Sequence, residues 1–161
     1  MMRIALCDGV SGKDWTERME KALDLEKACL PKPCDQVRIN INCHDWIEKI
    51  RACDAVLWPP GCMGIKPTSH LKEKVHFMQF HMGKLVVPNF ETVWHFESKV
   101  AQSYLFEFYK VPTPRTVATF SIEEAMALLK KERYPLVFKT SSDAASRGVR
   151  FVSSPTLGRA L

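Results

Sequence analysis

The residues best suited to chemistry lie near the end of the chain, where a lysine precedes a run of small polar residues. Residues 134–138 are mostly apolar and are expected to form a buried strand that ends in Lys139, and a second apolar stretch, expected to be another strand, follows at residues 149–152. A strand that ends in an ammonium group beside a loop of free backbone N–H groups is suited to binding a phosphate. Lys99, at the start of an expected helix, could supply a second positive charge. Besides the two lysines, the candidate phosphate-binding residues are Ser141, Ser142, Ser146, Arg147 and Gly148.

Each candidate also has an interpretation without chemistry. Lys139 can be a solvated residue at a strand end, Lys99 a solvated residue in a first helical turn, and Arg147 a solvated loop charge. The loop contains one glycine, Gly148, and Asp143 adds a negative charge close to the expected phosphate. These features favour a different kind of protein, a non-catalytic α/β binding or interaction module, and that alternative stays open at this point.

Composition and charge restrict the class of protein. Lys and Arg outnumber Asp and Glu by 23 to 18, and the resulting net charge of +5 suits an anionic ligand. The basic residues are spread along the chain and form no run interleaved with aromatics, so we expect no nucleic-acid binding. We expect no membrane span either, because no apolar stretch approaches the roughly 20 residues required. The N-terminus turns polar too soon for a signal peptide, which predicts a cytoplasmic protein.

The cysteines and histidines do not suggest a metal site. None of the six cysteines forms a C-x-x-C pair, so reduced thiols are predicted. His70, His76 and His81 are separated by six and five residues, whereas side chains that face each other on an α-helix are three or four residues apart. We therefore expect these three to be surface or partly buried histidines without zinc.

The first 95 residues alternate between apolar runs and amphipathic stretches. Such alternation predicts a mostly parallel sheet with helices on both faces. The run at 36–42 has one polar face and is expected near a sheet edge, whereas 55–58 and 85–87 are expected to be buried strands. Expected strands lie at 3–7, 36–42, 55–58 and 85–87, and expected helices begin near Asp14, Asp45 and Ser69.

The remainder of the chain, residues 96–161, has a different character. A helix is expected at 98–109, a short strand at 115–118, and a second helix after a capping box in which Ser121 and Glu124 satisfy each other's backbone N–H groups. Two strands then bracket the small-residue loop, and a last helix begins near residue 154. This part is predicted to be a small α+β lobe.

The segment from 96 to 152 resembles the ATP-grasp superfamily. The similarity rests on the proline-containing turn at 111–116, the helix that begins at Ser121, the strand at 135–139 that ends in lysine, and the loop end at 146–149. Each motif is weak alone, but all occur in the family's order after a strand-and-helix region. The resemblance divides the chain into a preceding α/β domain, residues 1–95, and an incomplete first ATP-grasp lobe, residues 96–161.

The resemblance implies a function and a set of binding residues. Members bind ATP between two lobes and activate a carboxylate as an acyl phosphate, which an amine or a thiol then attacks. ATP and a small carboxylate are thus the expected partners, and Lys99, Lys139 and the 141–148 loop are expected to hold the ATP phosphates. The Mg²⁺ ion is held in the family by acidic residues of a second lobe.

No counterpart of those acidic residues is present in the sequence. We therefore expect the chain to be the first part of a ligase and to be inactive by itself. The sheet face that carries Val137, Val149 and Phe151 is expected to be incompletely covered, which favours self-association.

Overall fold

The computed structural model describes residues 1–8, 13–26, 29, 33–59, 69–141 and 148–158. The chain forms two compact units, Met1–Val93 and Trp94–Leu161. Each unit is described separately below.

The first unit is built on a four-stranded parallel sheet, as the sequence predicts. Its strands are β1 (Met2–Asp8), β2 (Cys34–Asn40), β3 (Ala55–Leu57) and β4 (Leu85–Val87), in the spatial order β2-β1-β3-β4. β1 runs in register with β2 along its whole length and pairs with β3 on its other side. The half-polar run therefore lies at a sheet edge, as expected, and the continuous apolar run of β3 lies inside the sheet.

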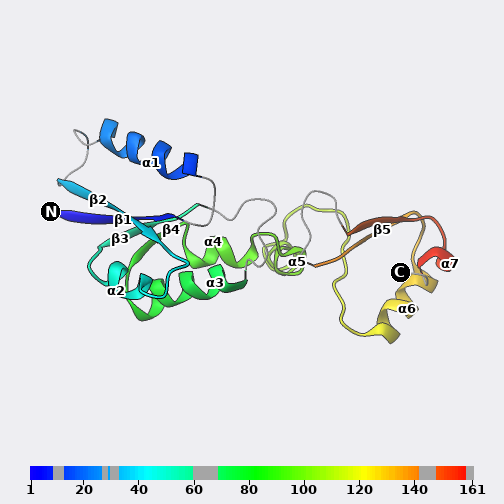
Figure 1. Ribbon diagram of the computed structural model, residues 1–161. Helices are drawn as coiled ribbons and strands as arrows, with labels where there is room; N and C mark the ends of the chain where they lie inside the picture. Colours follow the sequence, from blue (N-terminus) through cyan, green and yellow to red (C-terminus); the bar gives the residue numbers. More distant parts are fainter. Residues whose placement is uncertain (9–12, 27–28, 30–32, 60–68, 142–147, 159–161) are drawn as a thin grey trace. The chain divides into compact units, whose positions relative to one another are not determined.

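Helices cover both faces of this sheet (Figure 1). α1 (Lys13–Glu26) lies on one side, and α2 (Trp46–Arg51) and α3 (Ser69–His76) lie on the other. The larger apolar core lies on the α2 and α3 side and includes Ile39, Ile50, Val56, Val75 and Met78. Burial in this core raises the pKa of the Cys7 thiol to about 12, so this cysteine stays protonated. The described cysteines are all free thiols, in agreement with the sequence.

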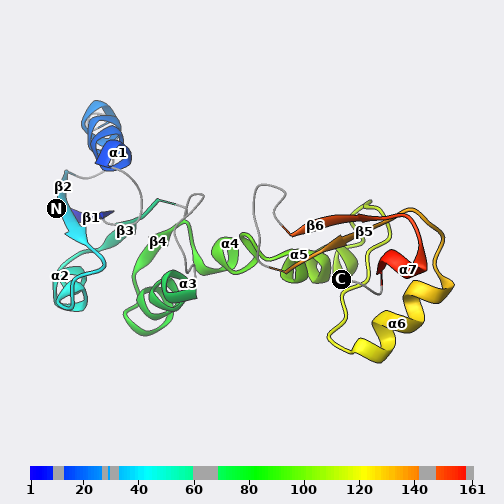
Figure 2. The ribbon, with the colours of Figure 1, turned by 45° about the vertical axis from the view of Figure 1, so that its right-hand side comes forward.

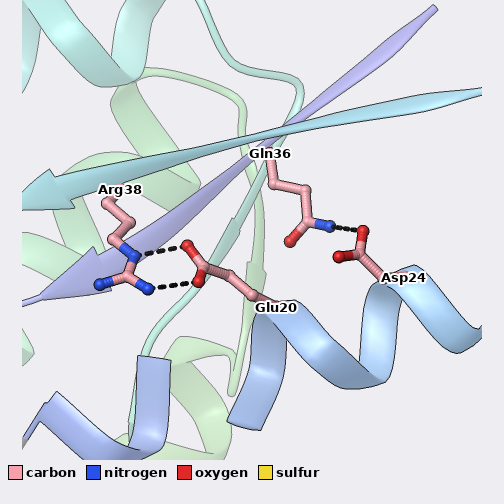
Figure 3. Close-up of polar contacts among 4 residues, drawn as sticks. All are labelled: Glu20, Asp24, Gln36 and Arg38. Carbon is pink, nitrogen blue, oxygen red and sulfur yellow. Dashed lines mark hydrogen bonds and ion pairs between the residues drawn. The ribbon is translucent and has the colours of Figure 1, made fainter. Parts of the chain in front are cut away.

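Polar side chains attach α1 to the edge strand (Figure 3). Arg38 on β2 donates two hydrogen bonds to the carboxylate of Glu20, and Gln36 Nε2 donates to Asp24 Oδ1 at 2.7 Å. Glu20 and Asp24 are four residues apart and so share a face of α1. The polar face of β2 is thus paired with acidic residues of the helix in contacts that stay exposed to solvent. Asp14 lies in the first turn of α1, which begins one residue earlier than the cap position expected for it.

The helix that begins at Ser69 changes its geometry before it ends. α3 is followed by a π-helix, η2 (Phe77–His81), and Met82 N–H donates to the Phe77 carbonyl oxygen at 3.0 Å across five residues. Gly83 then ends the segment with φ +63°, a left-handed conformation that favours glycine. A π-turn brings residues five apart onto one face, so the imidazoles of His76 and His81 lie 5.6 Å apart between ring centroids. The expectation that this spacing separates them was wrong, because it assumed α-helical geometry.

The prediction of a buried strand at 85–87 holds for the middle residue only. Val86 is buried, whereas Leu85 and Val87 are 65% and 49% exposed. β4 is an edge strand, and Leu85 and Val87 lie on the α1 side of the sheet, where α1 packs against β1 two strands away. In the described residues no helix covers this end of that face.

The second unit combines helices with one hairpin, and α4 (Phe90–His95) crosses from the first unit into it. Its further elements are α5 (Lys99–Phe108), α6 (Ile122–Lys131), β5 (Leu136–Lys139), β6 (Val149–Val152) and α7 (Pro155–Gly158). β5 and β6 lie side by side as an antiparallel pair (Figure 2). The described residues 111–120 contain no strand, so the expectation of one at 115–118 was wrong. An extended segment becomes a strand only when a partner accepts its hydrogen bonds, and β5 and β6 pair with each other.

The start of α6 forms only half of the predicted capping box. Ser121 Oγ accepts the backbone N–H of Glu124 at 3.2 Å, as expected. The Glu124 carboxylate instead accepts the Thr119 hydroxyl, whose oxygen in turn accepts the backbone N–H of Ser121 at 3.1 Å. The Glu124 carboxylate is therefore linked to the Ser121 N–H through the Thr119 hydroxyl and not by a direct hydrogen bond.

The hairpin sheet is covered on one face. Val152 is buried, and a Cβ atom added to Gly158 of α7 would lie 3.3 Å from the Val152 side chain and 2.7 Å from that of Leu129 on α6. On the opposite face Val137 is 53% exposed and Phe151 is 71% exposed. The open face agrees with the sequence-based expectation, whereas the description of residues 134–138 as a buried strand was wrong.

Candidate functional site

The loop between β5 and β6 is closed at its base by backbone hydrogen bonds. Lys139 pairs with Val149 in the ladder, and Thr140 N–H donates to the Gly148 carbonyl oxygen at 2.9 Å. Gly148 has φ +70°, in the left-handed region where a Cβ atom is unfavourable. The last residue of β5 and the first residue of β6 are therefore held at a fixed separation at the two ends of the loop.

The start of α5 lies against the first residue of the same loop. Ser98 caps this helix, since its Oγ accepts the backbone N–H of Ala101 at 3.2 Å. The backbone N–H of Lys99 donates to the carbonyl oxygen of Ser141 at 2.9 Å. Two segments that are far apart in the sequence, and that both carry a candidate phosphate-binding lysine, thus come together at the end of β5.

The structure locates four of the seven predicted site residues. Lys99 is the half-buried first residue of α5, and Lys139 is the exposed last residue of β5. Ser141 is exposed and follows two residues after Lys139, while Gly148 is half-buried at the other end of the loop. The expected loop residues Ser142, Ser146 and Arg147 lie outside the described residues.

Two residues with a role in this arrangement were not among the predicted site residues. Thr140 closes the base of the loop through its backbone, and its hydroxyl lies 3.5 Å from the same Gly148 oxygen. Ser98 orients the first turn of α5. A signal for Ser98 is present in the sequence, because serine is a preferred helix-capping residue. Thr140 has no comparable local signal, because its partner is eight residues away across the hairpin.

The described part of the arrangement places the backbone of Lys99 beside Ser141, two residues after Lys139. Lysine ammonium groups are strongly hydrated point charges that commonly bind phosphates. Among the described residues, no three His, Cys, Asp or Glu side chains gather in a way that could hold a metal ion. Over the same residues, the structure contains no helix with the length and apolarity needed to cross a bilayer.

The loops at the carboxyl ends of the parallel strands are described only in part. Residues 9–12 and 60–68, which follow β1 and β3, lie outside the described residues. After β4, Asn89 Oδ1 accepts the backbone N–H of Thr92 at 3.0 Å and its hydroxyl at 2.7 Å. Asn89 therefore caps α4, and this polar side chain has a structural explanation.

Comparisons with known proteins identify the fold. A scan of protein-family models and a search of curated protein sequences found no match. Among solved structures, an ATP-grasp RimK domain protein from Sphaerobacter thermophilus matches 98% of this chain with a TM-score of 0.62 and 17% sequence identity. N5-carboxyaminoimidazole ribonucleotide synthetase from Thermotoga maritima matches all of it, with a TM-score of 0.61 and 17% identity. D-alanine–D-alanine ligase from Bacillus anthracis matches 99%, with a TM-score of 0.55 and 20% identity.

The chain spans about half the length of these structures: 57% of the RimK domain protein, 44% of the synthetase and 52% of the ligase. The ligase also matches in a crystal form complexed with ATP, with a TM-score of 0.51. The matches extend over both units, and the resemblance inferred from the motifs at 111–149 is confirmed at the level of the fold. Over essentially its whole length, this chain shares the fold of these three structures, one of which is an ATP-grasp protein.

Proposed function

We propose that this chain is the N-terminal part of an ATP-dependent carboxylate–amine or carboxylate–thiol ligase. The observation that carries the proposal is the hydrogen bond from Lys99 N–H to the Ser141 carbonyl oxygen at 2.9 Å. It brings the two lysine-bearing segments to one end of the β5–β6 hairpin, where ATP phosphates would need both. The shared fold with ATP-grasp proteins, among them a ligase complexed with ATP, supports the same function.

In this proposal the residues of the loop and the two lysines hold the triphosphate. Lys139 and Lys99 supply ammonium groups, and the Arg147 guanidinium adds a third positive charge. Ser141, Ser142, Ser146 and Gly148 supply backbone N–H groups and hydroxyls. The exposure of Lys139 is compatible with this role, because its ammonium can reach a ligand without breaking a contact within the core.

The reaction proposed for the whole protein has two steps. A carboxylate oxygen of a small substrate attacks the γ-phosphorus of ATP, ADP leaves, and the resulting acyl phosphate is attacked by an amine or a thiol with release of phosphate. Mg²⁺ would compensate the charge on the transferring phosphoryl group. The described residues hold no group of acidic ligands for it, so we assign no residue of this chain to the metal.

The two parts of the chain have separate roles in this proposal. Residues 1–95 form the preceding α/β domain, and residues 96–161 form part of the first ATP-grasp lobe. The protein acts in the cytoplasm on ATP and a small carboxylate, without nucleic acid or membrane.

Titration of ATP into the full-length protein and two lysine variants tests the proposal. Lys139→Ala should weaken ATP binding on the order of tenfold, because it removes a charge-assisted contact that is exposed to solvent. Lys131→Ala is the matched control: Lys131 is also an exposed lysine, but it lies at the end of α6. The effect of a distant surface charge such as Lys131 on ATP affinity is screened beyond roughly 10 Å at ordinary salt concentration. Isothermal titration calorimetry measures all three affinities.

The same titration separates the ligase from its alternative. Equal ATP affinities of the Lys139→Ala and Lys131→Ala variants would contradict the assignment of Lys139. An absence of ATP binding in the unmodified protein would favour the non-catalytic α/β module.

A further inference from the structure

The π-helix places two imidazoles side by side on the surface of the first unit. His76 is the last residue of α3 and His81 is the last residue of η2, and both side chains are exposed. Their ring centroids are 5.6 Å apart and their planes are inclined by 50°. π-Turns are rare and occur often at functional sites, so the placement of two chemically versatile side chains by such a turn calls for an explanation.

Three phenylalanine rings hold the two imidazoles in position. The ring centroid of His76 lies 4.8 Å from that of Phe80 and 5.0 Å from that of Phe90, and the His76 and Phe90 rings are packed edge to face. His81 stacks on Phe77, with 5.5 Å between centroids and 25° between planes. Contacts of this kind restrict the rotamers of both histidines and lower the entropy that a ligand would have to remove.

Within the described residues, the ring nitrogens of His76 and His81 have no polar partner. In the part of the chain that the structure describes, neither His76 nor His81 takes part in a hydrogen bond or an ion pair. Gln79, between them in sequence, is engaged elsewhere: its amide donates to Glu91 at 3.2 Å and accepts from Phe90 N–H at 2.7 Å. The imidazole nitrogens are therefore available to a ligand from solvent.

We propose that His76 and His81 together bind one divalent transition-metal ion of the kind that prefers imidazole, such as Zn²⁺, Ni²⁺ or Cu²⁺. An imidazole nitrogen lies about 2.0–2.1 Å from Zn²⁺, which puts each ring centroid about 3.2 Å from the ion. Two such rings on a tetrahedral ion are about 5.2 Å apart. The observed separation of 5.6 Å between the ring centroids is close to this value. Water fills the other positions on the ion.

Calorimetric titration with Ni²⁺ at neutral pH tests this site. His76→Ala and His81→Ala should each weaken binding at least about tenfold, since each removes the gain in local concentration that the second ligand supplies. His70→Ala is the matched control, because His70 lies on α3 and makes no ring contact with the pair. Its affinity should equal that of the unmodified protein.

Nuclear magnetic resonance identifies the ligands directly and requires no enzymatic activity. The chain has five histidines, and paramagnetic Co²⁺ should broaden the ring signals of His76 and His81 before the other three. Equal broadening of all five signals, or Ni²⁺ affinities that neither substitution changes, would overturn the site. Far-ultraviolet circular dichroism checks that the variants fold, and these outcomes do not depend on the ATP proposal.

Discussion

At the scale of single residues, the candidate phosphate loop depends on backbone conformations as much as on charges. Gly148 adopts φ +70° while its carbonyl oxygen accepts the Thr140 N–H that closes the loop. A residue with a Cβ atom can keep that hydrogen bond only in a conformation that costs about 1–2 kcal/mol. The glycine is thus required by the geometry of the hairpin, independently of any ligand.

Substitution of Gly148 measures this requirement. We expect Gly148→Ala to lower the free energy of unfolding by about 1 kcal/mol and Gly148→Val to lower it further, because a β-branched side chain is least tolerant of positive φ. Gly148→Asn is the control, since asparagine enters the left-handed region more readily. Urea unfolding gives the three values. An alanine variant as stable as the unmodified protein would show that the loop base is not held in this conformation.

At the scale of elements, α1 is attached to the sheet through charges as well as apolar contacts. Arg38 on β2 holds both oxygens of Glu20, and this hydrogen bonding keeps the pKa of the Glu20 carboxyl below its ordinary value. A carboxyl whose pKa is lower in the folded state stabilises the fold above its unfolded pKa and loses that contribution as the pH falls through the folded value. Attachment of α1 should therefore weaken in acid.

Unfolding experiments at several pH values test the Glu20–Arg38 pair. The unmodified protein should be more stable than Glu20→Gln at neutral pH, and the difference should shrink as the pH falls below the ordinary glutamate pKa of about 4.3. Glu26→Gln is the control, since Glu26 also lies on α1 and is exposed. A Glu20→Gln effect that is the same at neutral and acid pH would mean that charge does not carry the contact.

At the scale of the whole molecule, apolar surface remains open on the second unit. Val137 and Phe151 lie opposite each other on β5 and β6 and are 53% and 71% exposed. The other face of this hairpin packs on α7, where Val152 is buried. Clustered exposed apolar side chains on a sheet commonly mark a surface that another chain or another lobe covers.

Self-association of the isolated chain follows from that surface. We expect a concentration-dependent dimer, and Phe151→Lys should raise its dissociation constant on the order of tenfold or more, because it removes a buried phenyl ring from the contact. Phe120→Lys is the control, since Phe120 is 82% exposed but lies outside the hairpin. Light scattering over a range of concentrations measures the mass. A monomer at every concentration would contradict the prediction.

The sequence alone was sufficient for the features that depend on local periodicity. The alternation of apolar runs predicted the parallel sheet, the polar face of residues 36–42 predicted an edge strand, and Ser121 predicted the start of a helix. The order of short motifs also predicted the ATP-grasp fold that the solved structures share. These features can be predicted because each depends on residues that are close together in the sequence.

Only the tertiary structure decided the features that depend on distant partners. The five-residue turn that joins His76 to His81 and the absence of a strand at 115–118 follow from how segments pack and pair. The contact of Lys99 with Ser141 likewise needs two segments separated by α5, α6 and β5 to meet. A strand, a π-turn or a binding site exists only when its partners are in place, and the partners' positions are not encoded in local spacing.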